Sequence, residues 1–252
     1  MSSPPSPAPM PDMHPRIENV RLVRGRSLVF DGLSLDLRER RIGLVGDNGA
    51  GKSSLFRLLC GLDLPGSGQV LLGSQSLHEA RAGKPGLVGM MFQNPDEQII
   101  FPTVAEELAL GLRPQGLSRR AAQEKAQAFL AGRGLQAWAD RAVASLSQGQ
   151  RQQVCWLSLL IAAPAVLLLD EPYASLDLPG QALLARDIAT AGQQIMVSTH
   201  VLGHVRAFER VIWLDQGKVR GDGPGAQVCA AYEDHVRERI HGQSANRTGG
   251  WC

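Results

Sequence analysis

Apolar residues either alternate with polar ones or form short continuous runs along most of the 252-residue chain. Residues 17–23 and 33–37 alternate as half-buried strands do. Continuous apolar runs, which are typical of buried parallel strands, occur at 41–45, 87–92, 165–169 and 194–198. The pattern also predicts a strand at 69–72, a helix at about 180–191 and a closing hairpin formed by 211–214 and 218–220. The order of these segments predicts an α/β core preceded by an antiparallel β-piece.

A helix-rich insert interrupts this strand pattern. From about Thr103 to Pro164 the chain is rich in Ala, Leu, Gln and Arg, which favour helix. Within this insert, Ser118 is the expected N-cap of a helix that runs to Gly132. A second helix is expected to begin near Ser147 and to end before the proline, which cannot continue a helix. The chain shows no internal repeat.

Composition and charge exclude several classes of protein. The chain is 44% hydrophobic and 20% charged, which is ordinary for a globular protein. Its net charge of +2 is too small to indicate nucleic acid or anionic lipid as the main partner. No apolar run is long enough for a membrane span. The four cysteines lack CxxC spacing, which argues against zinc and a disulfide framework and favours a reducing cytosol.

The two ends of the chain are expected to lie outside the folded domain. Residues 1–15 are rich in Ser and Pro and lack the apolar region of a secretory signal, so they are predicted to be a disordered tail. Residues 233–252 are predicted to be a C-terminal tail, with 242–252 loose. The expected domain therefore covers 16–232, with its helical insert at about 103–163.

A phosphate-binding loop is predicted where the strand at 41–45 ends. Residues 46–53 read GDNGAGKS and fit the pattern GxxxxGK[ST]. The glycines let successive N–H groups face a phosphate, and the start of the following helix adds positive potential. Lys52 is expected to reach the β- and γ-phosphates, and the Ser53 hydroxyl to ligate Mg²⁺. The predicted nucleotide contacts are Gly46, Asp47, Asn48, Gly49, Ala50, Gly51, Lys52, Ser53 and Ser54.

Two further strings carry candidate chemistry. Residues 167–172 form an apolar strand that ends in two acids, Asp170 and Glu171. Asp170 is placed to hold Mg²⁺ through water, and Glu171 to polarise an attacking water molecule. Residues 146–150, LSQGQ, open a predicted helix, where Ser147 and the glycine can cap the helix and bind an anion.

Six motifs in order resemble those of the nucleotide-binding subunit of an ABC transporter, over nearly all of 16–232. They are the Walker A loop at 46–53, the Q-loop Gln93, the signature at 146–150, Walker B ending in Asp170 and followed by Glu171, the D-loop at 175–177 and the switch His200. The resemblance implies a P-loop, RecA-like core with an antiparallel β-subdomain and an inserted α-helical subdomain. It also implies an ATPase whose cofactors are ATP and Mg²⁺.

The resemblance assigns roles to the residues that match these motifs. It implies a head-to-tail dimer in which ATP lies between Walker A of one subunit and the signature of the other. The signature contacts across the dimer would be Ser147, Gly149 and Gln150. The implied catalytic residues are Lys52, Gln93, Glu171 and His200, the last at the γ-phosphate, and the implied Mg²⁺ ligands are Ser53, Gln93 and Asp170.

The chain departs from the family pattern at three positions. Arg24 occupies the place of the aromatic residue that usually stacks on adenine. A guanidinium plane can stack on a base, but it can equally lie in solvent, and both alternatives remain open. Gln148 replaces a glycine of the signature, which affects the expected geometry there, and Arg40 stands where a glycine usually precedes the Walker A strand.

Residues 93–104, QNPDEQIIFPTV, resemble the energy-coupling-factor subgroup, whose importers take up vitamins and transition-metal ions. In that family the stretch receives a coupling helix of the membrane protein. Residues 173–179 and 210–214 look most like the short ATPase of the biotin system. The resemblance implies an ATPase dimer, expected to be a homodimer with a heterodimer left open, a transmembrane coupling subunit and a substrate-binding membrane subunit. It implies no nucleic acid and a peripheral place on the cytoplasmic face of the inner membrane. The alternatives are a cobalt or nickel importer and a non-transport ABC ATPase.

Overall fold

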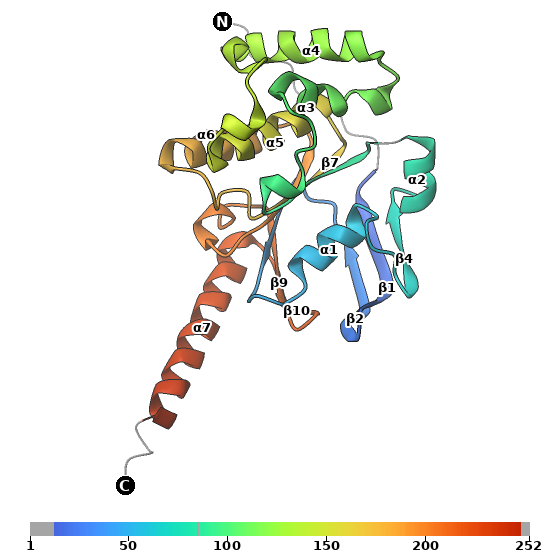
Figure 1. Cartoon of the computed structure of the whole chain (residues 1–252). Helices are drawn as coiled ribbons and strands as arrows, with labels where there is room; N and C mark the ends of the chain where they lie inside the picture. Colours follow the sequence, from blue (N-terminus) through green and yellow to red (C-terminus); the bar gives the residue numbers. More distant parts are fainter. Residues whose placement is uncertain (1–12, 85, 248–252) are drawn as a thin grey trace, which may run out of the picture.

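The computed structural model describes residues 13–84 and 86–247, which form two sheets (Figure 1). The antiparallel sheet contains β1 (Pro15–Arg24), β2 (Ser27–Asp36), β4 (Ser67–Leu72) and β5 (Gln75–Ser76), in the order β2-β1-β4-β5. The larger sheet contains β3 (Arg41–Val45), β6 (Val88–Met91), β7 (Val166–Asp170), β8 (Gln194–Ser198), β9 (Arg210–Asp215) and β10 (Lys218–Gly223), in the order β10-β9-β3-β8-β7-β6. Only its edge pair β9–β10 is antiparallel. The predicted strands are therefore confirmed.

Seven α-helices connect the described strands or follow them. Their bounds are α1 (Lys52–Leu59), α2 (Leu77–Gly83), α3 (Val104–Leu110), α4 (Arg119–Ala131), α5 (Gln148–Ala162), α6 (Leu178–Thr190) and α7 (Gly225–Arg247). Short 3₁₀ turns occur at 95–97, 113–115, 136–138, 143–145 and 202–204. The capped helices of the insert are confirmed, because the Ser118 hydroxyl accepts the N–H of Ala121 and Gly132 ends α4.

Helix α1 joins the two sheets into one core (Figure 1). Its residues Leu55, Phe56 and Leu58 are fully buried. They pack in one cluster with Ile17 of β1 and Leu44 of β3. Because α1 starts at the end of the phosphate-binding loop, this burial holds the loop between the two sheets.

A second core lies on the other side of the large sheet. Every residue of β7 and β8 is buried, as expected of central parallel strands covered on both faces. Trp156 of α5 and Ile188 of α6 belong to one buried cluster with Leu167 of β7. The indole N–H of Trp156 donates to Asp187 at 3.1 Å, which joins the two helices.

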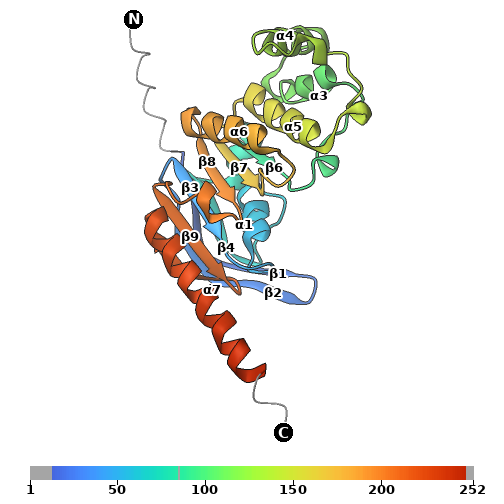
Figure 2. The ribbon, with the colours of Figure 1, turned by 90° about the vertical axis from the view of Figure 1, so that its left-hand side faces the viewer.

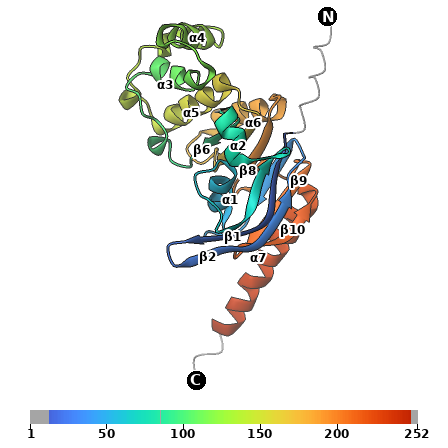
Figure 3. The ribbon, with the colours of Figure 1, turned by 90° about the vertical axis from the view of Figure 1, so that its right-hand side faces the viewer.

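Helices α3 and α4, with the outer face of α5, form a third cluster at one end of the molecule (Figure 3). Ala122, Ala126 and Leu130 follow one another on one face of α4 and are buried. The small side chains of Ala122 and Ala126 let α4 lie close to α3. This part corresponds to the predicted helical insert.

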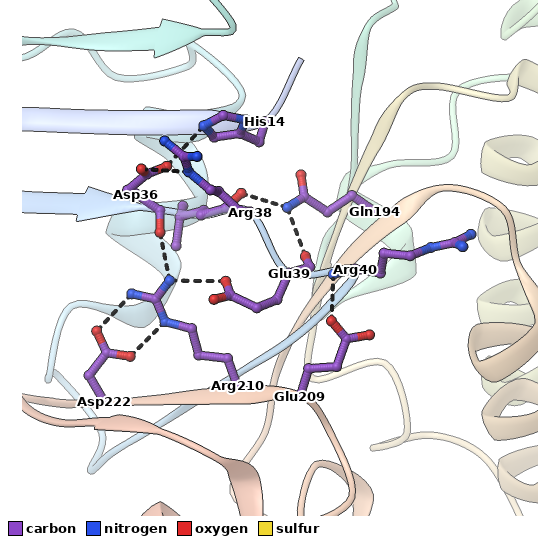
Figure 4. A network of polar contacts seen from close by, with 10 residues as sticks. His14, Asp36, Arg38, Glu39, Arg40, Gln194, Glu209, Arg210 and Asp222 are labelled. Atoms are coloured by element: carbon purple, nitrogen blue, oxygen red, sulfur yellow. Dashed lines mark hydrogen bonds and ion pairs between the residues drawn. The ribbon is translucent and has the colours of Figure 1, made fainter. Parts of the chain in front are cut away.

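A polar network fastens the segment between the two sheets (Figure 4). Arg210 donates to both carboxylate oxygens of Asp222 at 2.6 and 2.7 Å, to the Asp36 carbonyl at 2.6 Å and to Glu39 at 3.0 Å. The Asp222 bond raises the pKa of Arg210 above its ordinary value despite partial burial. The buried Gln194 amide donates to the carbonyls of residues 37 and 39. These bonds fix where β2 ends and β3 begins.

The ends of the chain depart from the predicted boundaries. The sequence predicts Pro15 in the disordered tail, but this residue begins β1 and pairs with Leu72 of β4. Residues 1–12 lie outside the described part. The prediction of a tail from 233 and of a loose segment from 242 is wrong as far as Arg247, because α7 continues to that residue. Figure 2 shows α7 lying beside β9 and then extending away from the sheets. None of the described helices is long and apolar enough to span a membrane.

Candidate nucleotide site

Four neighbouring parallel strands, β3, β8, β7 and β6, end at the same edge of the large sheet. Leu44 lies opposite Ser198, which lies opposite Asp170 in the next strand. Parallel strands bring their carboxyl ends together, and ligands of such sheets bind there. The segments that leave this edge carry the predicted residues Gly46–Ser53, Gln93, Glu171 and His200.

The backbone of the phosphate-binding loop requires glycine at defined positions. Gly46 and Gly51 have φ values of +142° and +109°, in the region that favours glycine. A Cβ atom on Gly46 would lie 2.1 Å from the Leu214 carbonyl oxygen, and one on Gly51 would lie 2.9 Å from the Phe30 ring. The loop is therefore held against β9 and β2 before it enters α1, whose N-terminus can receive an anion.

Lys52 lies folded into this loop. Its ammonium donates to the carbonyl of Gly46 at 2.7 Å and to that of Asp47 at 3.0 Å, and the residue is 9% exposed. Burial lowers the pKa of Lys52, while the charges of Glu171, Asp170 and Asp47 oppose that shift. The structure therefore brings the loop lysine within electrostatic reach of the two acids that end β7.

Of the two acids that follow one another here, Asp170 is buried in the protein and Glu171 lies at the edge of the large sheet. Asp170 is the last residue of β7 and is 6% exposed. Glu171 has φ +49°, and its N–H donates to the Ser198 carbonyl at 3.0 Å. Its Oε2 lies 2.9 Å from Nδ1 of the largely exposed His200. A carboxylate oriented by an imidazole at a sheet edge is suited to position and deprotonate a water molecule.

The signature residues lie at the start of α5, in the helical part. Ser147 caps the helix through the N–H of Gln150 at 3.2 Å, and the Gln150 side chain accepts the N–H of Ser147 at 3.1 Å. A Cβ atom on Gly149 would lie 2.9 Å from the Ser175 carbonyl, so this turn packs on the D-loop. The described contacts of these residues do not reach the phosphate-binding loop of the same chain. Their contact with nucleotide stays a prediction for a dimer.

The segment after β6 is fastened at two points. Gln93 is exposed just beyond the strand. The side-chain oxygen of Gln98 accepts the N–H of Phe92 at 3.2 Å. Glu107 of α3 is only 4% exposed, and its Oε2 accepts the N–H groups of Ile100 and Phe101, both at 2.9 Å. The segment thus has fixed ends, while the Ile100 side chain is 74% exposed.

Arg24 is engaged with the protein in this structure. Its Nε lies 3.5 Å from Oδ2 of Asp63. The same carboxylate accepts hydrogen bonds from Arg57 at 3.0 to 3.2 Å. About half of the Arg24 side chain is exposed. Stacking of Arg24 on adenine stays a prediction.

Three features of this region had no motif to reveal them. Tyr232 and Arg239 of α7 both bind the carboxylate of Asp47. His204 stacks on Tyr173 with ring centroids 3.8 Å apart. Buried Glu107 is the third. The one available signal was an acid inside a phosphate-binding loop, which requires a compensating cation from elsewhere in the chain.

The family is established by comparison with known proteins. The family model described as ABC transporter matches residues 30–174. The biotin transport ATP-binding protein BioM of Rhodobacter capsulatus is 46% identical over 216 residues, covering 86% of this chain and 92% of that protein. The energy-coupling factor transporter ATP-binding protein EcfA1 of Streptococcus thermophilus is 37% identical over 183 residues, covering 71% of this chain and 66% of that protein.

A solved structure agrees in fold. The structure of cbiO1 from Clostridium perfringens, described as part of the ABC transporter complex cbiONQ, has a TM-score of 0.74 and 24% identity, covering 91% of this chain and 96% of that chain. This likeness shows the fold alone. The matched family model and the identity to relatives over most of their length show that the chain belongs to the ABC transporter family.

Proposed function

We propose that this chain is the ATP-hydrolysing subunit that energises an energy-coupling-factor importer, and that the cargo of that importer is biotin. The main observation in favour of hydrolysis is the contact between Glu171 Oε2 and His200 Nδ1, which lie 2.9 Å apart. This contact lies at the sheet edge where Lys52 and Asp170 are also found. The biotin cargo is supported by the similarity to BioM of Rhodobacter capsulatus.

The residues at the edge fit a magnesium nucleotide. The glycine-dependent loop, the lysine folded into it and a buried acid at the adjoining strand end form the donor set of a P-loop site. Residues 46–54 would hold the phosphates, and Ser53, Gln93 and Asp170 would hold Mg²⁺. The bound metal supplies neutralisation of phosphate charge.

The chain's own side chains account for the hydrolytic step. Lys52, now bonded to two loop carbonyls, turns to the phosphates when they arrive, because their charge attracts it more strongly. Glu171 orients the attacking water and accepts its proton. His200 holds the Glu171 carboxylate and contacts the γ-phosphate.

The proposed assembly rests on the separation of the signature residues from the phosphate-binding loop of the same chain. The signature residues Ser147, Gly149 and Gln150 serve the nucleotide of a second copy in a head-to-tail homodimer. Residues 93–104 contact the transmembrane coupling subunit, which works with a substrate-binding membrane subunit. The chain would act peripherally at the cytoplasmic face of the inner membrane, without nucleic acid. The hydrogen bonds that fasten residues 92, 100 and 101, together with the exposed Ile100, support this surface.

The nucleotide site is tested by comparing ATP turnover of the purified wild-type chain with that of Lys52→Ala. We expect Mg²⁺-dependent phosphate release that the substitution abolishes, because the variant loses the charge on the phosphates. Nucleotide binding unchanged in Lys52→Ala would contradict the site.

Uptake of biotin, cobalt and nickel by the assembled complex tests the cargo. We expect ATP-dependent uptake of biotin alone, and uptake of a metal ion alone would replace the biotin assignment.

A further inference from the structure

The phosphate-binding loop contains one acidic residue, Asp47, at its second position. The carboxylate of Asp47 is bound from a distant element, α7. The Tyr232 hydroxyl donates to its Oδ1 at 2.8 Å, and Arg239 Nη1 donates to its Oδ2 at 2.5 Å. Both oxygens of the carboxylate therefore have a partner on the same helix.

The spacing of these two partners suits a helix. Tyr232 and Arg239 are seven residues apart, so they lie on one face two turns from each other. The beginning of that helix is anchored, because Cys229 is fully buried and Tyr232 packs on Trp213 with ring centroids 5.1 Å apart. Helix α7 thus presents both side chains to the loop from a fixed base.

The charge of Asp47 bears directly on phosphate binding. Against the effect of burial, it raises the pKa of Lys52, the residue that is proposed to bind the phosphates. An uncompensated carboxylate in this loop would repel a triphosphate. The Arg239 hydrogen bond, followed by that of Tyr232, lowers the pKa of Asp47, and burial together with Asp47 raises the pKa of Tyr232 to about 12. The carboxylate is ionised and compensated by α7.

We propose that Arg239 and Tyr232 are positioning residues of the nucleotide site, which neutralise and immobilise Asp47 so that the loop accepts the phosphates of ATP. This inference rests on the proposed ATP binding at residues 46–54. Arg239 acts through Asp47 and supplies the positive charge, while Tyr232 fixes the orientation of the carboxylate. Helix α7 is then part of the site, although no motif marks it.

The test measures the dissociation constant of Mg²⁺-ATP for the full chain at two salt concentrations. Arg239→Ala should weaken binding by about threefold to fivefold at low salt, as for a partly exposed charge pair, and by less at high salt. Arg239→Lys keeps the charge and should stay near wild type. Arg237→Ala is the matched control, because Arg237 pairs with Asp234 on the same helix and not with the loop.

A second background separates an effect through Asp47 from general damage to α7. In Asp47→Asn the carboxylate charge is gone, so adding Arg239→Ala should change the affinity by less than about twofold. Tyr232→Phe should weaken binding in the wild-type background only. Equal affinity of Arg239→Ala and wild type would overturn the proposal, as would an Arg239→Ala effect that persists in Asp47→Asn. Absence of ATP binding by the wild-type chain would instead refute the proposed function.

Discussion

At the scale of single residues, the backbone of Glu171 lies in the left-handed region at φ +49°, an unfavourable conformation for a residue with a Cβ atom. The bond from its N–H to the Ser198 carbonyl holds this turn directly after a fully buried strand. The turn leaves the Glu171 carboxylate only 12% exposed and beside His200. A strained backbone at this point fits a site that requires a defined direction of the Glu171 side chain.

Glu171→Gln should keep ATP binding and slow turnover by on the order of 10²-fold, because the amide can accept a hydrogen bond from water but cannot take its proton. Phosphate release under saturating ATP, with a separate binding isotherm, measures both quantities. Glu124→Gln, an exposed change on α4, is the control. Turnover of Glu171→Gln within a factor of two of wild type would remove Glu171 from this role.

His204, stacked on Tyr173, predicts a pH dependence of stability. Burial lowers the pKa of His204; the charge of Glu171 opposes this shift, and His200 adds a smaller lowering. The unfolded chain therefore binds this proton at a higher pH than the folded chain does. The stabilising contribution is present above the unfolded pKa of about 6.5 and is lost as pH falls through the lower folded value.

The free energy of unfolding should thus fall less between pH 7 and pH 5 in His204→Phe, which keeps a ring on Tyr173, than in wild type. Denaturant titrations at both pH values measure the difference. His78→Phe, at an exposed position of α2, should behave as wild type. Equal pH dependence in His204→Phe and wild type would show that the stacked ring does not titrate as described.

At the scale of elements, Glu107 links the helical part to the segment that follows β6. Its carboxylate accepts two consecutive N–H groups while almost fully buried. Movement of α3 must therefore carry residues 100 and 101 with it, which is the behaviour expected of a rigid lever.

Glu107→Ala should leave these two N–H groups without partners, at a cost of about 1–3 kcal/mol for each one that stays buried. Amide exchange at Ile100 and Phe101 should accelerate, while ATP turnover of the isolated chain persists. Glu97→Ala, at an exposed position of the same segment, should leave exchange unchanged. Unaltered protection of both amides in Glu107→Ala would mean that the carboxylate does not fasten the segment.

Elements with a strong local signal could be predicted from the sequence. The strand at 194–198 and the helix caps at Ser118 and Ser147 agree with the structure because apolar runs and capping residues act locally. The length of α7 could not be predicted, because its second half has no apolar face to mark it. Its bonds to Asp47 join residues 185 and 192 positions apart, and no local pattern encodes such contacts.

At the scale of the whole molecule, the proposed function assigns nucleotide contacts to two separate parts of the chain. The phosphate-binding loop lies between the two sheets, and the signature opens α5 at the edge of the helical part. Closure around ATP would therefore require a second subunit and would move the helical parts with it. Residues 93–104 join β6 to α3, so in the proposed assembly they would pass the movement to a membrane partner.

Biotin uptake by vesicles that contain the assembled complex tests the central claim, that ATP hydrolysis at this site drives import. Complexes with the wild-type chain and with Glu171→Gln are compared at equal subunit content, with ATP supplied on the side that the chain faces. The account predicts biotin accumulation with the wild-type chain, and a loss on the order of 10²-fold in the steady uptake rate with Glu171→Gln. Equal steady biotin uptake by the two complexes would contradict it.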